Sequence, residues 1–318
     1  MGYTAELEKR QAGYEKIVLI TRKTRLAELV ERFNTHAQAK FYIEHSGGDF
    51  TEYELEDEAY KKSLETVRQA IEVGLKIQVV DRGLLPTLTF LPGDLIVTLG
   101  QDGVVANTAK YVGAQPIVAI NPDPERFDGV LLPFQPAQTR VALKSVVEHR
   151  SKMRKITLAL AALEDGQRLL AFNDLFVGAQ SHVSARYRIR WQKAEEPQSS
   201  SGVLISTGAG CTGWISSVFN MTAGLAALSG VRGVKPVHLD WEDPRLFFVV
   251  REPFLSRHSS VGIVAGMIAA GQGLELESLM PSGGVIFSDG VESDYLQFNS
   301  GAKLTIRAAA ESARLVVG

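Results

Sequence analysis

The sequence predicts two domains of different class: an α/β N-terminal domain with a mainly parallel, Rossmann-like sheet, and a β-rich, β-sandwich-like C-terminal domain. In the first half, apolar runs of strand length alternate with helical segments, which is the pattern of a parallel sheet. After about residue 150, short strand-like runs separated by glycine and serine turns dominate, as in β-rich domains. The length of 318 residues favours two domains, which we expect at 1–150 and 151–318.

Each element of the first half follows from a local pattern. Short continuous apolar runs indicate buried strands, whereas apolar residues spaced by three and four indicate helices. Thr24 is the expected N-cap of the first helix, and Gly74 is expected to end the second. The expected elements are strand Lys16–Ile20, helix Thr24–Phe33, helix Glu54–Val73, strand Leu75–Val80, strand Leu95–Leu99, helix Val104–Val112, strand Ile117–Ile120 and helix Gln138–His149.

The second half is expected to be built mostly of strands. One helix is expected between Trp214 and Leu228, and Glu195 to Ser201 is expected to be a polar loop. The expected strands are Lys155–Leu160, Gln167–Ala171, Leu175–Val177, Val183–Trp191, Gly202–Ile205, Leu246–Val250, Val261–Ala265, Gly284–Phe287 and Lys303–Arg307.

The composition excludes several classes of protein. Hydrophobic residues make up 45% of the chain and charged residues 22%, which is typical of a globular protein. The net charge of −2 gives no electrostatic reason to expect nucleic acid or a membrane as partner. The single Cys211 excludes an intrachain disulfide and a cysteine-rich zinc site, and it favours a reducing compartment. Because no apolar signal segment is recognisable at the N-terminus, we expect a cytoplasmic protein.

The region after Leu95–Leu99 carries the strongest functional signal. This apolar run ends in Gly100-Gln101-Asp102-Gly103, and a helical segment and a second strand follow. A strand, a glycine turn and a helix in this order direct backbone N–H groups and a helix N-terminus toward phosphate. Asp102 stands within the turn, where a carboxylate can accept a proton or help to hold a metal ion. The pattern predicts a nucleotide site.

A second glycine-rich segment, Gly208-Ala-Gly210-Cys-Thr-Gly213, matches the G-x-G-x-x-G pattern of dinucleotide-binding proteins. That interpretation requires a βαβ unit and an acidic residue roughly 20 residues further on, and the nearest candidate, Asp240, comes late. A glycine turn that serves only tight packing is the alternative. A P-loop motif is absent from the sequence.

Four motifs in a consistent order resemble the NAD kinase family. Gly100-Gln-Asp-Gly-Val104 resembles the G-G-D-G-T motif, and Asn173-Asp174 resembles the Asn-Glu motif. The segment Gly202–Trp214 is similar to the family's D-G-x-I-x-x-T-P-T-G-S-T-A-Y, and Asp289-Gly290 matches a further Asp-Gly. The similarity is greatest to the mitochondrial-type branch and its bacterial relatives, through Asn121–Arg126, Ser-Ser-Gly at 200–202 and Val250–Pro253. The resemblance spans about residues 16 to 318.

The resemblance implies an NAD kinase-like fold and the ATP-dependent phosphorylation of the 2′-hydroxyl of NAD, with ATP, NAD and Mg²⁺ as ligands. Asp102 would act on the hydroxyl as general base, or as the group that orients the hydroxyl and Mg²⁺. The residues expected to bind nucleotide phosphates are Gly100, Gln101, Gly103 and Val104, and those expected to bind NAD are Asn121, Asp123, Asn173, Asp174, Thr207, Gly210, Thr212 and Trp214. The resemblance also implies a homodimer or homotetramer.

Each assignment has a structural alternative. Asp102 before a helix is also a typical N-cap, and Asn173-Asp174 between two apolar runs is also a typical turn. Trp214 is equally compatible with a core position at the start of a helix. The six histidines show no ligand spacing, so we do not expect a metal ion fixed by protein side chains.

The departures from the family pattern leave other functions open. Gln101 replaces a glycine, and a left-handed backbone there would cost about 1–2 kcal/mol. Val104 replaces a threonine, whose buried hydrogen bond would be worth about 1–3 kcal/mol. Ser201, Gly208-Ala209 and Cys211 depart as well. The alternatives are therefore a related kinase acting on a lipid or sugar hydroxyl, or a non-catalytic nucleotide-binding protein.

Overall fold

The computed structural model describes residues 13–318. The chain divides into two compact units, the first running to Arg154 and including Arg314–Gly318, and the second comprising Lys155–Ala313. The last residues of the chain therefore return to the first unit. Among the described residues, no helix is long and apolar enough to cross a membrane.

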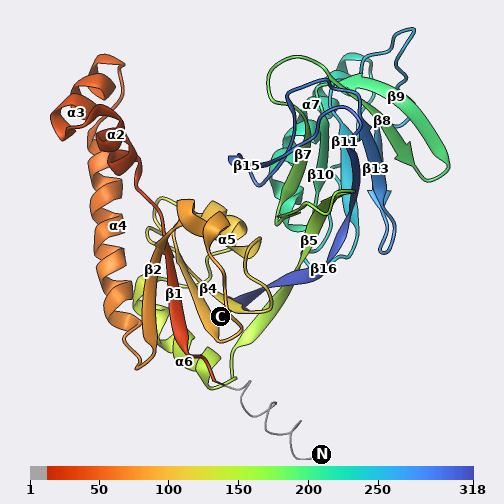
Figure 1. Ribbon diagram of the computed structural model, residues 1–318. Coiled ribbons are helices and arrows are strands. Elements are labelled where there is room, and N and C mark those ends of the chain that lie inside the picture. The colour runs from red at the N-terminus through yellow and green to blue at the C-terminus, as the bar shows by residue number, and fades with distance from the viewer. Residues whose placement is uncertain (1–12) are drawn as a thin grey trace, which may run out of the picture. The chain divides into compact units, whose positions relative to one another are not determined.

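The first unit contains a parallel sheet, as the alternation of strands and helices predicts (Figure 1). The strand order is β2-β1-β3-β4-β16, in which only the end of β16 takes part, through Arg314 and Leu315. β1 pairs with β2 on one side and with β3 on the other, so the chain reverses its direction of winding between β1 and β3. The strands are β1 (Lys16–Thr21), β2 (Lys76–Asp81), β3 (Asp94–Leu99), β4 (Pro116–Ile120) and β16 (Lys303–Val317).

Helices cover both faces of this sheet. Side chains of α4 and α6 pack on one face against Ile17, Leu19 and their neighbours, whereas α5 contacts β1, β3 and β4 and the 3-10 turn η1. Thr24 caps α2 as expected, because its side chain accepts the N–H of Ala27. The helices are α2 (Arg25–Phe33), α3 (His36–His45), α4 (Thr51–Ala70), α5 (Asp102–Ala109) and α6 (Thr139–Val147), with 3-10 turns η1 (Arg82–Thr87) and η2 (Pro136–Gln138).

The helix α3 was not expected from the sequence. It packs with α2 at one end of the long α4, and Leu26, Ala39, Ile43 and Phe50 form a small separate core there (Figure 1). The sequence of α3 lacks a clear apolar stripe, and Phe41 and Tyr42 are exposed. Tertiary contacts with α2 and α4 therefore support this helix more than its own periodicity does.

The second unit contains antiparallel sheets around one core, in agreement with the β-rich prediction. One sheet has the order β12-β11-β10-β7-β14-β15. The other is formed by the start of β16 with β13, β8 and β9, and β5 and β6 join it beside β16. The strands are β5 (Lys152–Leu163), β6 (Arg168–Ala171), β7 (Asp174–Ala179), β8 (Ala185–Trp191), β9 (Ala194–Ser200), β10 (Val203–Ser206), β11 (Leu246–Val250), β12 (Ala265–Ile268), β13 (Leu274–Ser278), β14 (Gly284–Ser288) and β15 (Val291–Gln297).

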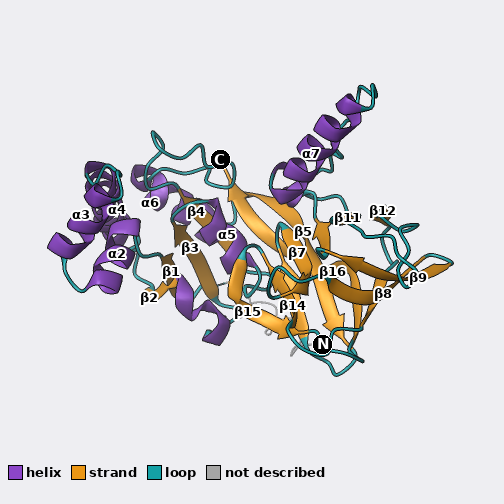
Figure 2. Ribbon diagram, turned by 90° about the horizontal axis from the view of Figure 1, so that it is seen from above, coloured by secondary structure: helices purple, strands orange, loops and turns teal. Residues whose placement is uncertain are grey.

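Between β10 and β11 lie the 3-10 turn η3 (Ala209–Thr212) and the helix α7 (Trp214–Leu228), which was expected. Figure 2 shows α7 projecting from the sheets of its unit, and Ile215 is its one buried residue among those described. Met221, Leu225 and Leu228 are exposed on it.

Two expectations for the second half were wrong, and two strands were missed. The segment expected to be a polar loop is β9, which forms a hairpin with β8. Its polar residues Gln198 and Ser200 are buried because both hydrogen-bond the Tyr187 hydroxyl, at 3.0 and 2.7 Å. The strand expected at 261–265 instead begins at Ala265, and β13 and β15 were missed.

Candidate functional site

The turn between β3 and α5 has the arrangement that the sequence predicts. β3 ends at Leu99, and α5 begins at Asp102 with Gln101 as its N-cap residue. Gln101 has φ −80° and ψ 170°, an extended conformation that any residue adopts. The left-handed backbone that would have made glutamine costly at this position is absent, so glutamine fits the turn without backbone strain.

Two backbone donors are available at the start of α5. The N–H groups of Asp102 and Gly103 belong to the first turn of the helix and have no acceptor among the described residues. The N–H of Val104 is already used, because it donates to the carbonyl of Gln101 at 2.8 Å. The helix dipole adds a partial positive charge at this end. The arrangement can bind an anion through the first two residues of α5.

The two glycines of the turn differ in their surroundings. A Cβ atom on Gly100 would lie 2.6 Å from the Cγ2 atom of Val104, so Gly100 is required by packing. Val104 itself is 1% exposed and acts as a core residue. A Cβ atom on Gly103 would meet no described atom within 4 Å, and Gly103 is exposed to solvent. Packing gives no reason for glycine at position 103.

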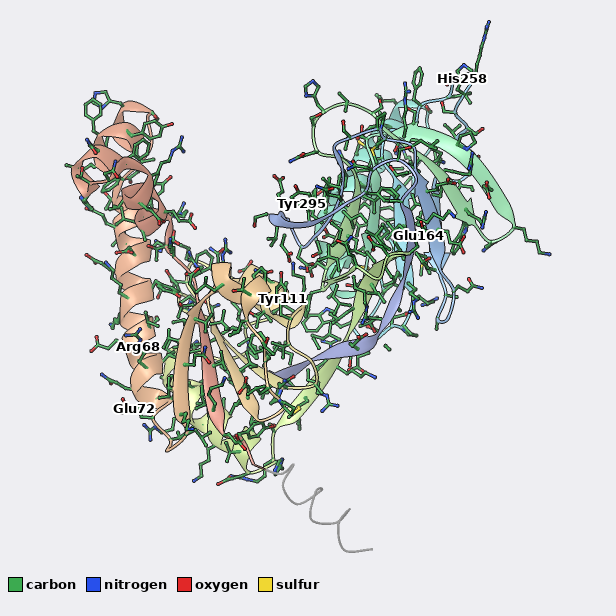
Figure 3. The ribbon with its side chains drawn as sticks, viewed as in Figure 1. Arg68, Glu72, Tyr111, Glu164, His258 and Tyr295 are labelled. Atoms are coloured by element: carbon green, nitrogen blue, oxygen red, sulfur yellow. The ribbon has the colours of Figure 1, made fainter. Side chains whose placement is uncertain are left out.

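Asp102 does not cap the helix, so the N-cap alternative was wrong. Its carboxylate accepts the N–H of Leu131 at 2.9 Å and that of Val130 at 3.2 Å. A carboxylate offers about four acceptor positions, so two remain available beside the free N–H groups of the turn. Asp102 is half-buried, and α5 runs from it toward Tyr111, which is labelled in Figure 3.

Asn121 and Asp123 organise the loop that reaches Asp102. The Asn121 side chain donates to the carbonyl of Phe127 at 2.9 Å and accepts the N–H of Asp123 at 3.0 Å. The carboxylate of Asp123 forms an ion pair with Arg126 at 2.9 Å. These polar atoms are used within the loop, whose later residues Val130 and Leu131 donate their N–H groups to the Asp102 carboxylate.

In the second unit, Asn173 and Asp174 lie at the start of β7 and are held by Asp289. The Asp289 carboxylate accepts the N–H groups of Phe172 at 2.9 Å, Asn173 at 2.6 Å and Asp174 at 3.3 Å. Asp289 adopts φ 53°, a left-handed conformation that aspartate tolerates better than most residues. The sequence shows that Asp289 matches an Asp-Gly motif of the family, but it does not predict the contact of Asp289 with residues 172–174.

Asp174 is a buried carboxyl group without a hydrogen-bond donor in the part of the chain that the structure describes. It is 9% exposed. Burial raises its pKa to about 7, and the nearby negative charge of Asp289 adds to this effect. A carboxyl group that is buried and unpaired is characteristic of a functional site.

The segment Thr207–Gly210 interlocks with residues 172–174. The Thr207 hydroxyl donates to the carbonyl of Phe172 at 2.5 Å and accepts the N–H of Gly210 at 3.2 Å. A Cβ atom on Gly210 would lie 2.1 Å from the Asn173 carbonyl oxygen, and one on Gly208 only 1.9 Å from the Asp240 carbonyl oxygen. Both glycines are therefore required for close approach of the backbone.

The dinucleotide interpretation of Gly208–Gly213 was wrong. It requires a parallel βαβ unit, but the preceding strand β10 is antiparallel to both of its neighbours, β7 and β11. Downstream of this turn, Thr212 is exposed. Trp214 is half-buried, stacks on Phe176 with ring centroids 5.6 Å apart, and lies under the guanidinium of Arg251 at 5.2 Å.

The expected site residues thus form two groups, one in each unit. In the first, the turn 100–104 lies beside the loop that contains Asn121 and Asp123. In the second, Asn173, Asp174, Thr207 and Gly210 lie together. Thr212 and Trp214 follow in η3 and at the start of α7. Within the described residues, no group of three or more His, Cys, Asp or Glu side chains could hold a metal ion.

Comparison with solved structures identifies the fold. The chain is similar to yeast NADH kinase in complex with NADH, with a TM-score of 0.60 and 15% sequence identity over 96% of this chain and 84% of that chain. It is also similar to an NAD kinase from Archaeoglobus fulgidus in complex with ATP, with a TM-score of 0.54 and 17% identity over 94% of this chain and 93% of that chain. The chain has the NAD kinase fold.

This result confirms the predicted fold class, an α/β domain followed by a β-rich domain. No protein-family model matches the sequence, and no curated protein is similar to it. The NAD kinase fold of this chain therefore rests on three-dimensional structure.

Proposed function

We propose that the chain is an NAD kinase-like phosphotransferase that uses ATP to phosphorylate the 2′-hydroxyl of NAD. The observation that carries this proposal is the turn after β3. The first two residues of α5 supply a carboxylate, from Asp102, and two free backbone N–H groups, from Asp102 and Gly103, at the N-terminus of the helix. Phosphoryl transfer depends mainly on positioning and on neutralising charge, and this turn supplies both kinds of group.

The donor phosphates are assigned to the start of α5. The N–H groups of Asp102 and Gly103 would donate to phosphate oxygens, and the absence of a side chain at Gly103 leaves room for them. Gly100 and Val104 would shape the turn through their packing contact, and Gln101 would border it. Mg²⁺ bound with ATP would neutralise phosphate charge, and the free acceptor positions of the Asp102 carboxylate suit this ion.

Asp102 is assigned to the acceptor hydroxyl. The oxygen of the 2′-hydroxyl would form a bond to the γ-phosphorus while the bond to ADP breaks, and the hydroxyl proton would pass to the Asp102 carboxylate. The N–H groups of Val130 and Leu131 hold this carboxylate in one orientation. Asn121 and Asp123 would contribute on the NAD side by fixing this loop.

The NAD nucleoside is assigned to the second group of residues. The unpaired carboxyl of Asp174 and the amide of Asn173 suit the paired donors and acceptors of a ribose diol. Thr207 and Gly210 would shape the wall of this site, while Thr212 and Trp214 would border the nucleotide.

Three further properties are proposed from the resemblance to the family. The chain would be cytoplasmic, would form a homodimer or homotetramer, and would belong near the mitochondrial-type branch. The exposed apolar side chains Met221, Leu225 and Leu228 on α7 are compatible with self-association. Light scattering of the purified protein tests the oligomeric state directly.

The structure of the altered motif is more favourable to kinase activity than its sequence suggests. Gln101 is unstrained and Val104 is packed in the core, so neither residue distorts the turn. The lost threonine hydroxyl is the remaining deficit. A kinase for a lipid or sugar hydroxyl and a non-catalytic nucleotide-binding protein remain as outcomes of the test below.

The test is NADP formation from NAD, ATP and Mg²⁺ by the wild type and by Asp102→Asn, with Asp128→Asn as control. Asp128 is an exposed carboxylate in the same loop. We expect turnover in the wild type and the control, and a loss of at least a hundredfold in Asp102→Asn. Absence of turnover with nucleotide binding retained would reject the proposal. A screen of lipid and sugar acceptors for phosphate transfer from ATP would then separate the two alternatives.

A further inference from the structure

β1 and β3 are neighbours at the point where the strand order reverses, so the residues that follow β1 lie beside the nucleotide turn that follows β3. In open α/β sheets, ligands bind outside the carboxyl ends of the strands at such a reversal. β1 and β3 are parallel with Ile20 opposite Thr98, and continuing this register places Arg22 opposite Gly100. Arg22 therefore follows β1 as the glycine turn follows β3.

The guanidinium of Arg22 is held in a fixed orientation by buried groups. One terminal nitrogen donates to the Glu56 carboxylate at 2.8 Å, and the other donates to the Lys23 carbonyl at 3.0 Å. The guanidinium lies 5.2 Å from the ring centroid of Tyr60. The Tyr60 hydroxyl accepts the backbone N–H of Arg22 at 2.9 Å and donates to the carbonyl of Leu99 at 3.2 Å. Arg22 is thereby tied to the last residue of β3.

The Nε–H donor of Arg22 is left without an acceptor. The residue is 9% exposed, and its Nε–H is buried with no hydrogen-bond partner in the described part of the chain. The Cδ atom of Arg22 lies 3.5 Å from the position that a Cβ atom on Gly100 would occupy. Since Nε is bonded to Cδ, the unsatisfied donor is one bond away from this contact with Gly100. Unpaired buried donors are rare and call for an explanation.

Two arginines of this cluster share one buried carboxylate, while burial raises the pKa of Tyr60 and the Asp81 carboxylate lies close enough to raise it further. Arg22 and Arg25 both hydrogen-bond the carboxylate of Glu56, which is 2% exposed. Burial alone would raise the pKa of Glu56, but the hydrogen bonds from Arg22 and Arg25 outweigh burial and lower it. Glu56 is therefore ionised at neutral pH, and two cations share one anion.

We propose that Arg22 recognises a phosphate group of the polyphosphate bound at the N-terminus of α5. The phosphate oxygen would be the acceptor that Nε–H lacks, and a local shift of the guanidinium or of the Gly100–Asp102 turn would bring them together. Arginine suits this role because its guanidinium has several donors, so one nitrogen can bind Glu56 while Nε–H stays available for a phosphate oxygen. The assignment of this polyphosphate to ATP rests on the proposed function, whereas the anion site itself does not.

The test uses inorganic tripolyphosphate as probe, with its binding measured by calorimetry for the full chain. The variants are Arg22→Lys and Arg22→Gln, and the control is Lys23→Gln, which removes an equal charge from the exposed neighbour that pairs with Glu31. We expect both Arg22 variants to bind tripolyphosphate about tenfold to a hundredfold more weakly, and the control to bind within twofold of the wild type. In kinetics, the KM for ATP should rise by a similar factor while the KM for NAD stays within twofold.

Arg22→Lys guards against misfolding because it keeps a positive charge beside the buried Glu56. The double variant Arg22→Gln/Glu56→Gln serves the same purpose by removing both charges together. Thermal unfolding confirms that each variant is folded. Wild-type affinity for tripolyphosphate in a folded Arg22→Lys and in the double variant would overturn the inference, as would the absence of tripolyphosphate binding to the wild type. If the wild type forms no NADP but its tripolyphosphate binding depends on Arg22, the anion site stands and the proposed function fails.

Discussion

Gly103→Ala separates ligand binding from stability at the nucleotide turn. Gly103 is the second residue of α5, and a methyl group there would meet no described atom within 4 Å. Alanine in a helix is more favourable than glycine by about 0.5–1 kcal/mol. We therefore expect the free energy of unfolding to rise by about this amount, and Tm to rise by about 1–4 °C.

The same methyl group should weaken nucleotide binding. If phosphate oxygens approach the N–H of Gly103, the added carbon occupies part of their space, and overpacking of this kind costs about 1–3 kcal/mol. The affinity for ATP, measured by calorimetry, should fall by a factor of about 5 to 150. The two effects have opposite signs, so a general loss of structure cannot produce both.

The matched control is Gly224→Ala in α7. This glycine also lies within a helix, and a Cβ atom there would meet no described atom within 4 Å. It should give a similar gain in stability with unchanged affinity for ATP. An affinity within twofold of the wild type in Gly103→Ala would refute the placement of phosphate at this turn. A lower Tm in that variant would refute the structural argument.

Three further predictions follow from other contacts. Gly210→Ala should lower the free energy of unfolding by about 1–3 kcal/mol in chemical denaturation, because its Cβ atom would lie 2.1 Å from a backbone oxygen. The pKa of Asp174 is raised from 3.8 to about 7 by burial and by Asp289, so the contribution of Asp174 to stability is complete below about pH 4 and is lost as the pH rises to 7. Asp174→Asn should abolish this decline, which amounts to as much as about 4 kcal/mol, and denaturation at pH 5 and 8 would detect it; an identical decline in the variant would contradict the assignment. Tyr60→Phe should cost about 1–3 kcal/mol by leaving the buried N–H of Arg22 without its acceptor, and unchanged stability would show that this hydroxyl contact is unimportant.

The local signals in the sequence were sufficient for most elements near the site. The strand before Gly100, the helix after it and the strand Pro116–Ile120 are each defined by runs of apolar residues that are close in sequence. By contrast, the sequence of β9 predicts a polar loop because its buried residues Gln198 and Ser200 are polar. Their burial depends on the Tyr187 hydroxyl on the neighbouring strand, which strand pairing brings into contact.

The sequence by itself determined the order of the two domains and the strand–glycine–helix turn around Asp102. These features depend on periodicity and on residues that are adjacent in the chain. Only the tertiary structure decided what the polar side chains contact. Asp102 holds an N–H group 29 residues away, and Asp289 holds one 116 residues away. Arg22 meets Gly100 because β1 and β3 are neighbours, and that strand order depends on the packing of the whole sheet.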